Sequence, residues 1–290
     1  MEYFLEVSLV GIAIGGVYAL IAVGYALVYR TTRVVNFAHG NMMMFGAYFF
    51  FTFAAIFDLH WSISIILTLI CAALLGAGIE RLLIRPLLGR PAISVVMVTV
   101  GMASILHGLA QMIWTAEDFF LPQVFPDSPI IIDDMYIPAN TGYGFLVALG
   151  AIGILLLIFR FTRSGIAMRA TAADQIAATT MGINVPAMFS LTWIYTAITA
   201  ALAGIVVGSI TTLNPSMGLI GLSVLAVVIL GGLDSIFGAI LAGLIVGWIE
   251  ALTGFYIGAS FKDVIPFIVL LAILIIRPHG LFGTPEIERL

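Results

Sequence analysis

Charged side chains are scarce in this sequence. Asp, Glu, Lys and Arg make up 9% of the 290 residues, whereas hydrophobic residues make up 62% and the mean hydropathy is +1.20. A soluble domain needs roughly a quarter charged residues to cover its surface, so this composition excludes an ordinary soluble protein. The net charge is −4 and no basic run exists, which gives nucleic-acid binding no electrostatic support.

Lysine, cysteine and histidine are also rare, and each shortage excludes one kind of chemistry. The single lysine, Lys262 in GASFKDV, does not fit the phosphate-binding pattern G-x-x-x-x-G-K-[ST], so this chain cannot hydrolyse ATP by that route. The single cysteine, Cys71, excludes an internal disulfide. The four histidines are too scattered for a metal site. We therefore predict no metal, no cofactor and no enzymatic activity in this chain.

Long apolar runs take the place of the missing polar residues. About 20 apolar helical residues cross a hydrocarbon core of ~30 Å, and the sequence divides into nine candidate segments: Ser8–Tyr29, Val34–Phe57, Ser62–Leu83, Ala92–Thr115, Gly142–Phe159, Pro186–Leu213, Gly218–Leu233, Ile236–Ile257 and Phe261–Ile276. The seventh and ninth are short for straight spans, so we expect broken or re-entrant helices there. We predict an all-α polytopic membrane protein of about eight or nine transmembrane helices, with an internal repeat, in one domain over residues 1–290.

Two details of the runs fit this prediction. Small residues recur at four-residue spacing, which favours close packing of membrane helices; the sets are Gly11 with Gly15, Gly204 with Gly208, and Ala239 with Gly243 and Gly247. Glu2 and Glu6 occupy the region where a cleaved signal peptide needs positive charge. We therefore expect the N-terminal run to be the first membrane span.

The basic residues predict the orientation, because Lys and Arg resist translocation across the membrane. With the N-terminus outside, the cytoplasmic segments hold ten of the eleven basic residues: Arg30, Arg33, Arg81, Arg85, Arg90, Arg160, Arg163, Arg169, Arg277 and Arg289. The outer side collects acidic residues: Glu2, Glu6, Asp58, Glu117, Asp118, Asp127, Asp133, Asp134 and Asp263. We predict a periplasmic N-terminus, a cytoplasmic C-terminus, an outer loop over about 117–141 and an inner loop over about 160–185.

Polar residues and glycines interrupt two of the apolar runs. They are VVNFAHGNMMMFGAY (34–48) and ILGGLDSIFGAILAG (229–243). Transporters often build a midplane passage from paired interruptions, because freed backbone groups must face water or substrate and not lipid. We place Asn36, His39 and Asn41 in a candidate substrate pathway. The alternative is that each interruption only links two spans and that the polar residues serve packing.

Three further titratable residues lie within apolar runs. Glu80 adjoins Arg81, which favours an interfacial ion pair, and an interhelical hydrogen bond is favoured over a proton relay for His107. Glu250, in GWIEALTG, is the hardest to explain as packing. We therefore add Glu250 to the candidate substrate pathway, with a position near the outer interface as the alternative.

Five stretches, in order and over nearly the whole chain, together resemble the permeases of bacterial branched-chain amino-acid ABC importers, and the length resembles the smaller of that system's two permeases. The stretches are GGVYALIAVGYALVYRTTRVVNFAHGNMMMFGAY (15–48), RLLIRPLLGRPAISVVMVTVG (81–101), RSGIAMRATAADQIAATTMGINV (163–185), ILGGLDSIFGAILAGLIVGWIE (229–250) and IIRPHGLFG (275–283). The resemblance implies a multi-pass protein of the cytoplasmic (inner) membrane whose domain is a single permease unit.

The resemblance also implies partners and a coupling segment. The partners are a second homologous permease, two cytoplasmic ATPase subunits and a periplasmic substrate-binding protein. The third stretch resembles the short helix that such permeases insert into a groove of the ATPase, and the matching residues are Arg169, Ala170, Asp174, Ala177, Ala178, Gly182 and Ile183. Many relatives carry an acidic residue where this chain has Ile176. Gly182 suits a helix stop before Pro186.

Two other functions stay open at this point. Urea and short-amide importers have similar permeases, so a branched-chain amino acid is the first expectation for the cargo and a urea or amide is the alternative. A stand-alone ion-coupled carrier is a further alternative, and it would transport without any ATPase.

Overall fold

The structure is a computed structural model that describes residues 2–87, 89–126, 128–132 and 135–284. Asp127, Asp133, Asp134 and Arg289, which belong to the predicted charge asymmetry, lie outside the described residues. The described residues form α1 (Glu2–Thr32), α2 (His39–Phe51), α3 (Trp61–Ile79), α4 (Ala92–Trp114), β1 (Ile130–Ile132), β2 (Met135–Ile137), α5 (Ala139–Phe161), α6 (Arg163–Ala173), α7 (Gln175–Thr180), α8 (Val185–Ile210), α9 (Ile220–Gly231), α10 (Ile236–Tyr256) and α11 (Ile265–Ile276). The predicted all-α polytopic fold is confirmed.

Seven helical segments of the described chain are long and apolar enough to cross a membrane, when α11 is counted with the short 3₁₀ turn before it. The other two predicted segments are short helices. As expected, α9 has only 12 residues, whereas α2 has 13 although a full span over Val34–Phe57 was predicted. The difference arises because residues 33–38 are not helical. A π-helical turn, Thr52–Ile56, continues α2 at its far end.

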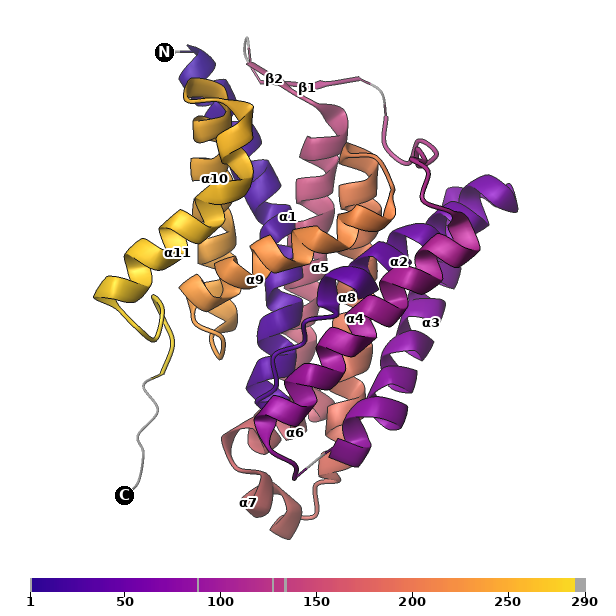
Figure 1. The fold of residues 1–290 in the computed structure, drawn as a ribbon, viewed down its shortest axis with the longest axis vertical. Helices are drawn as coiled ribbons and strands as arrows, with labels where there is room; N and C mark the ends of the chain where they lie inside the picture. Colours follow the sequence, from indigo (N-terminus) through magenta and orange to yellow (C-terminus); the bar gives the residue numbers. More distant parts are fainter. Residues whose placement is uncertain (1, 88, 127, 133–134, 285–290) are drawn as a thin grey trace.

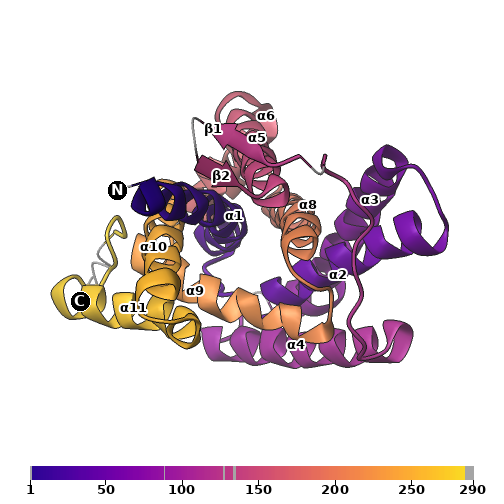
Figure 2. The ribbon, with the colours of Figure 1, turned by 90° about the horizontal axis from the view of Figure 1, so that it is seen from above.

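One order of elements occurs twice, in opposite directions (Figure 1). In the first half, α1 descends, the chain breaks, and α2, α3 and α4 follow; in the second, α8 ascends, the chain breaks at residues 211–214, and α9, α10 and α11 follow. The second break therefore precedes α9. The interruption predicted at 229–243 instead forms the end of α9, a turn and the start of α10. Seen from above, α9 extends from the α10–α11 side of the molecule towards α2 and α4 (Figure 2).

Small residues allow the closest helix contacts. A Cβ at Gly15 would lie 2.8 Å from the Gly243 carbonyl oxygen, and one at Gly247 would overlap the Gly15 backbone, so α1 and α10 pack with their backbones touching. A Cβ at Gly40, in the first turn of α2, would overlap the Gly218 carbonyl oxygen just before α9. The small residues of α1 and α10 that were expected to favour close helix packing therefore lie in one contact between these two helices.

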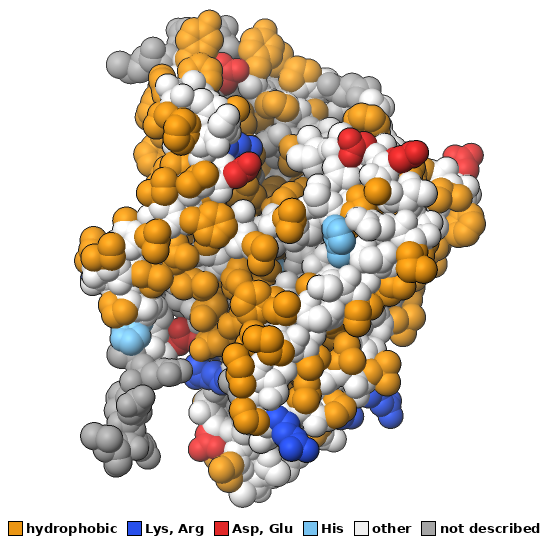
Figure 3. All heavy atoms as spheres, viewed as in Figure 1, with side chains coloured by type: hydrophobic (Ala, Val, Ile, Leu, Met, Phe, Trp, Pro, Cys, Tyr) orange, Lys and Arg blue, Asp and Glu red, His pale blue; other side chains and the backbone are white. Residues whose placement is uncertain are grey.

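The two ends of the bundle differ in structure and charge. At the upper end of Figure 1, the connection between α4 and α5 carries the β1–β2 hairpin, paired antiparallel with Ile130 opposite Ile137. At the lower end, α6 and α7 form a helical hairpin below the bundle. On the face in Figure 3, most acidic side chains lie near the upper end and most basic ones near the lower end. The sequence-predicted separation of charge is thus present along the long axis.

The core lies where α1, α2 and α8 meet. Trp193, Tyr48 and Met43 are among its fully buried side chains. The outward faces of α3, α4 and α11 instead expose large apolar residues such as Leu74 and Ile275. Figure 3 shows apolar side chains spread over the surface between the two charged ends. Such a surface suits a lipid environment.

Candidate functional site

Asn36 holds the turn that leads into α2. Its side-chain oxygen accepts a hydrogen bond from the Ala38 backbone N–H at 3.1 Å, and its Nδ2 lies 3.5 Å from the Met42 sulfur. The His39 backbone N–H also donates to the Asn36 carbonyl oxygen at 3.3 Å. Asn36 is 1% exposed, so these contacts use the carboxamide within the turn. A short polar side chain is needed here because a helix that begins inside an apolar bundle leaves N–H groups without intrahelical partners.

His39, the first residue of α2, is fully buried against α1. Its Nε2 lies 3.2 Å from the Ile21 carbonyl oxygen, and its ring lies 4.3 Å from the Tyr25 ring, centroid to centroid. The ring covers Gly24, where an added Cβ would approach His39 Cε1 to 2.6 Å. His39 Nδ1 has no hydrogen-bond partner among the described residues. The imidazole therefore fastens the start of α2 to the middle of α1.

Asn41 differs from its two neighbours because it faces an open groove. The groove has a volume of about 360 Å³ and lies between α2, α4 and the start of α9; Ser104, His107 and Leu222 also line it. The Asn41 carboxamide packs against Gly218, and no described residue hydrogen-bonds it. His107 bonds Gln111 on its own helix at 3.1 Å, so the predicted interhelical bond is replaced by one within α4. Of the three clustered polar residues, Asn41 is the one available to a solute.

Glu250 lies in a different place, near the upper end of α10. Its Oε1 accepts a hydrogen bond from the Tyr18 hydroxyl at 3.0 Å and lies 3.5 Å from Lys262 Nζ. The carboxylate is buried, whereas the Lys262 side chain is 42% exposed. The four residues predicted for one pathway thus occupy two locations: Asn36, His39 and Asn41 at the start of α2, and Glu250 at this ion pair.

The predicted coupling segment forms a helical hairpin outside the bundle. Asp174 ends α6 and begins α7, and its carboxylate accepts hydrogen bonds from Ile176 N–H at 2.8 Å and Ala177 N–H at 3.0 Å. Gly182 ends the hairpin with φ +82°, a conformation that L side chains rarely adopt. Aspartate at a helix start and glycine after a helix end are the residues that this geometry requires.

One face of the hairpin holds it to α8 and the opposite face is free. Ala178 is buried with Val185 and Phe189, and Ile183 packs against the three. Ile176, in the first turn of α7, is 81% exposed, and Met181, just after the end of α7, is 82% exposed. Two large apolar side chains on a projecting helix are typical of an interaction surface.

The remaining coupling residues lie on the same hairpin. Arg169 is exposed and donates to the Arg160 carbonyl oxygen at the end of α5, at 3.3 Å. Ala170, also on α6, receives the Asp174 N–H, while Ala177 is exposed on α7. The seven residues predicted from the third stretch are therefore contiguous in space.

An ion pair between buried Glu80 and partly exposed Arg85 fixes the base of α8 just above the hairpin. Arg85 donates two hydrogen bonds to the Glu80 carboxylate, both at 3.1 Å, and the Ser190 hydroxyl donates to the same carboxylate at 2.6 Å. The predicted ion pair of Glu80 is confirmed, but its partner is Arg85 and not the adjacent Arg81. The reason is the π-helical turn Glu80–Ile84, which turns residue i+5 onto the face of residue i.

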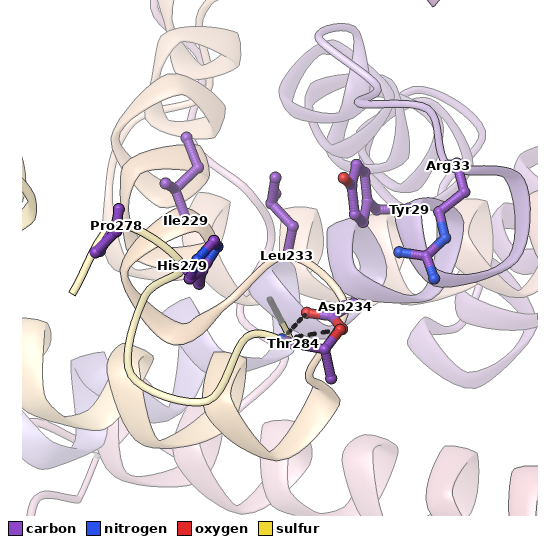
Figure 4. Close-up of a pocket in the computed structure, with 8 residues that line it drawn as sticks. All are labelled: Tyr29, Arg33, Ile229, Leu233, Asp234, Pro278, His279 and Thr284. Atoms are coloured by element: carbon purple, nitrogen blue, oxygen red, sulfur yellow. Dashed lines mark hydrogen bonds between the residues drawn. The ribbon is translucent and has the colours of Figure 1, made fainter. Parts of the chain in front are cut away.

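A second cavity at the lower end joins three stretches that the sequence singled out. It has a volume of about 240 Å³, and Tyr29, Arg33, Asp234 and His279 are among its lining residues (Figure 4). The chain after α11 is held there by backbone N–H groups of Leu281 and Phe282, which bond carbonyl oxygens in the last turn of α9. The IIRPHGLFG stretch therefore completes the end of α9, where carbonyl groups lack partners within the helix.

Lys262, Tyr18 and Ser190 also belong to these sites, and none of the three was predicted as a site residue. Lys262 carried a signal, because a single lysine among outer acidic residues needs a partner. Tyr18 and Ser190 carried none, since each contacts a residue more than 100 positions away. Among the described residues no group of three or more His, Cys, Asp or Glu side chains could hold a metal ion.

Comparison with known proteins gives consistent matches. Residues 8–274 match the family described as "Branched-chain amino acid transport system / permease component". The high-affinity branched-chain amino acid transport system permease protein LivH of Salmonella typhimurium is 33% identical over 99% of this chain and 98% of that protein. BraD of Pseudomonas aeruginosa, of the same description, is 32% identical over 99% of this chain and 98% of its own. A probable LivH of Methanocaldococcus jannaschii is 31% identical over 91% and 88%.

Proposed function

Because this chain belongs to the family of permease components of branched-chain amino acid transport systems, we propose that it forms the membrane passage of an ATP-driven importer for branched-chain amino acids. The observation that carries the proposal is the α6–α7 hairpin. It projects from the arginine-rich end, exposes Ile176 and Met181, and is anchored to α8. This chain lacks a phosphate-binding loop of the G-x-x-x-x-G-K-[ST] kind, so an external ATPase is needed to drive it.

The partners follow from this function. Two cytoplasmic ATPase subunits would bind the hairpins of this chain and of a second homologous permease. A periplasmic binding protein would deliver the amino acid at the opposite end, where the 115–138 connection and the β1–β2 hairpin lie. The charge separation supports this orientation, with the arginine-rich end in the cytoplasm and the N-terminus in the periplasm.

The passage is assigned to the start of α2. We expect Asn41 to meet the cargo in the groove beside α4, while Asn36 and His39 keep the first turn of α2 in place. Glu250 contributes from the outer end. A helix that starts inside the bundle places its positive dipole end near the passage, which suits a carboxylate.

Reconstitution tests the function directly. Proteoliposomes that hold this chain, its permease partner and the ATPases should take up L-leucine only with internal ATP and external binding protein. Urea and acetamide as cargo test the amide alternative in the same vesicles. Uptake by this chain alone without ATP would replace the proposal by an ion-coupled carrier.

Cysteine labelling tests the orientation. In a Cys71→Ala background, a membrane-impermeant reagent added from the periplasm should modify Ser128→Cys and leave Ala177→Cys, which is exposed on α7, unmodified until the membrane is opened. The reverse pattern would invert the orientation and place the hairpin outside.

A further inference from the structure

The ion pair at the outer end of the molecule joins two cavities. Lys262 lines both a cavity of about 600 Å³, which Glu250 and Glu6 also line, and a smaller one of about 80 Å³ between α1, α8 and α9. Tyr18 lines the small cavity and donates to Glu250. Figure 3 shows this face hollowed near its upper end, beside the lobe formed by α10 and α11. A cation and an anion are thus held side by side at an opening.

The small cavity is almost wholly apolar. Ile14, Val17, Val207, Ile210 and Ile220 line it, and Thr211 joins the tyrosine and the lysine as its polar wall. A protein cavity of roughly 150 Å³ lined by aliphatic residues holds benzene, which has six carbons. A volume of about 80 Å³ therefore fits a branched aliphatic group of three or four carbons.

The charges beside the cavity match the two ends of one kind of molecule. A free α-amino acid carries an ammonium and a carboxylate on the same carbon that bears its side chain. Glu250 Oε1 lies 3.5 Å from Lys262 Nζ, longer than the 3.0 Å bond that it accepts from Tyr18, so the lysine is the looser partner. A zwitterion can separate the pair and leave neither charge unpaired, which a neutral solute or a simple ion cannot do.

We propose that Lys262 and Glu250 bind the carboxylate and the ammonium of an α-amino acid at the outer end of this chain, with the branched side chain in the small cavity. This site rests on the proposed function and adds a specificity element to the permease itself. Asp263, next to the lysine, and Glu6 add negative charge at the mouth, where an ammonium enters. Thr211, just above α8, places the site at the break before α9.

The role of the two charged residues is tested by measuring L-leucine uptake per assembled transporter. Glu250→Gln and Lys262→Met should each lower L-leucine uptake at least 10-fold, with assembly measured by co-elution of all subunits. The charge swap Glu250→Lys/Lys262→Glu should not restore uptake, since the two binding groups then exchange places. Near-normal uptake in both single variants, or recovery above half in the swap, would reduce the pair to a structural contact and overturn the proposal.

A substitution that fills the small cavity tests whether this cavity receives the side chain of the amino acid. This test is independent of the charges of Lys262 and Glu250. Ile210→Phe should lower leucine uptake at least 5-fold, while Val10→Phe, which lines only the large cavity, should leave it within 2-fold. Equal effects of the two would count against the pocket. If the wild-type transporter takes up no leucine, the proposed function is wrong. If the wild type takes up leucine and these variants take it up equally well, the proposed function stands and only this binding site is wrong.

A phosphatidylethanolamine headgroup also carries an ammonium and an anion, and the membrane composition separates it from an amino acid. Wild-type uptake should be the same in vesicles of phosphatidylcholine with and without phosphatidylethanolamine. A fall to the level of the Lys262→Met variant when that lipid is removed would assign the site to the lipid and overturn the proposal.

Discussion

The start of α2 and the α6–α7 hairpin both contain residues that the sequence singled out, yet the two regions differ in the exposure of their large side chains. At the start of α2, Asn36 and His39 are buried and bonded to their own chain. On the hairpin, Ile176 and Met181 are more than 80% exposed and contact nothing that buries them. The contacts of Asn36 and His39 thus lie within one subunit, whereas the exposed side chains of the hairpin belong to the surface proposed to bind the ATPase.

Disturbing the packed start of α2 should destabilise the fold. Gly40→Val should have the largest effect, because its side chain would overlap the Gly218 backbone, which cannot move aside as a flexible side chain could. Overpacking of this kind costs typically 1–3 kcal/mol or more. We expect the yield of folded protein, measured by size-exclusion chromatography, to fall at least 5-fold. Gly101→Val, where an added Cβ meets nothing within 4 Å, is the control.

A substitution in the hairpin should separate folding from transport. Gly182→Val forces a β-branched residue to φ +82° in open space, so the turn between α7 and α8 changes while the bundle is untouched. Assembly should stay within 2-fold, and leucine uptake and substrate-stimulated ATPase activity should fall at least 10-fold. Gly182→Asn, which tolerates this conformation, should keep most activity. Full activity of Gly182→Val would remove the hairpin from the coupling path.

His39→Ala and Asn41→Ala compare a buried residue of α2 with a residue of the same helix that faces the groove. Loss of the buried imidazole leaves a void against Gly24 and Tyr25, so His39→Ala should lower the folded yield about 3-fold and leave uptake per folded molecule nearly normal. Asn41→Ala should leave the folded yield nearly normal and lower the uptake per folded molecule, because the Asn41 side chain faces the groove. Normal yield with strongly reduced uptake for His39→Ala would place the imidazole itself in the passage.

The smallest effect is expected at the start of α7. Ile176→Ser removes one exposed apolar side chain from the surface that the ATPase is proposed to cover, and burial of a side chain of this size is worth about 1.5–3 kcal/mol at most. We expect ATPase binding to weaken 3- to 10-fold, measured by titration of detergent-solubilised permease, with no change in folded yield. Unchanged binding would show that the partner does not cover Ile176.

Sequence reasoning succeeded where the signal was local. Apolar runs predicted the long helices, and Gly182 was expected to end a helix and does end α7, because this position needs a residue that tolerates positive φ. The sequence did not predict the features that depend on how distant segments of the chain are arranged. The second interruption lies before α9 and not after it, which the glycines at 231–232 concealed.

Local irregularities of the backbone explain why the partners in two ion pairs were not predicted. Glu80 pairs with Arg85 because a π-helical turn adds a residue to the helical repeat, and the residues ERLLIR contain no signal that predicts this turn. Glu250 meets Lys262 because the chain reverses at Gly258, φ +145°, and returns along α10. These contacts depend on the backbone path between the two residues, which composition and spacing leave open.

The hydrogen bonds among Glu80, Arg85 and Ser190 fix the lower end of α8 to the end of α3. The helix has 26 residues, which at 1.5 Å per residue is about 39 Å. Its lower end receives the hairpin, and its last turn lines the small cavity at the opposite end. A tilt of about 5° around its lower end would carry that last turn sideways by roughly 3 Å, the width of a water molecule. Because Val207 and Ile210 line the small cavity, a small tilt of α8 around its base would change the width of that cavity.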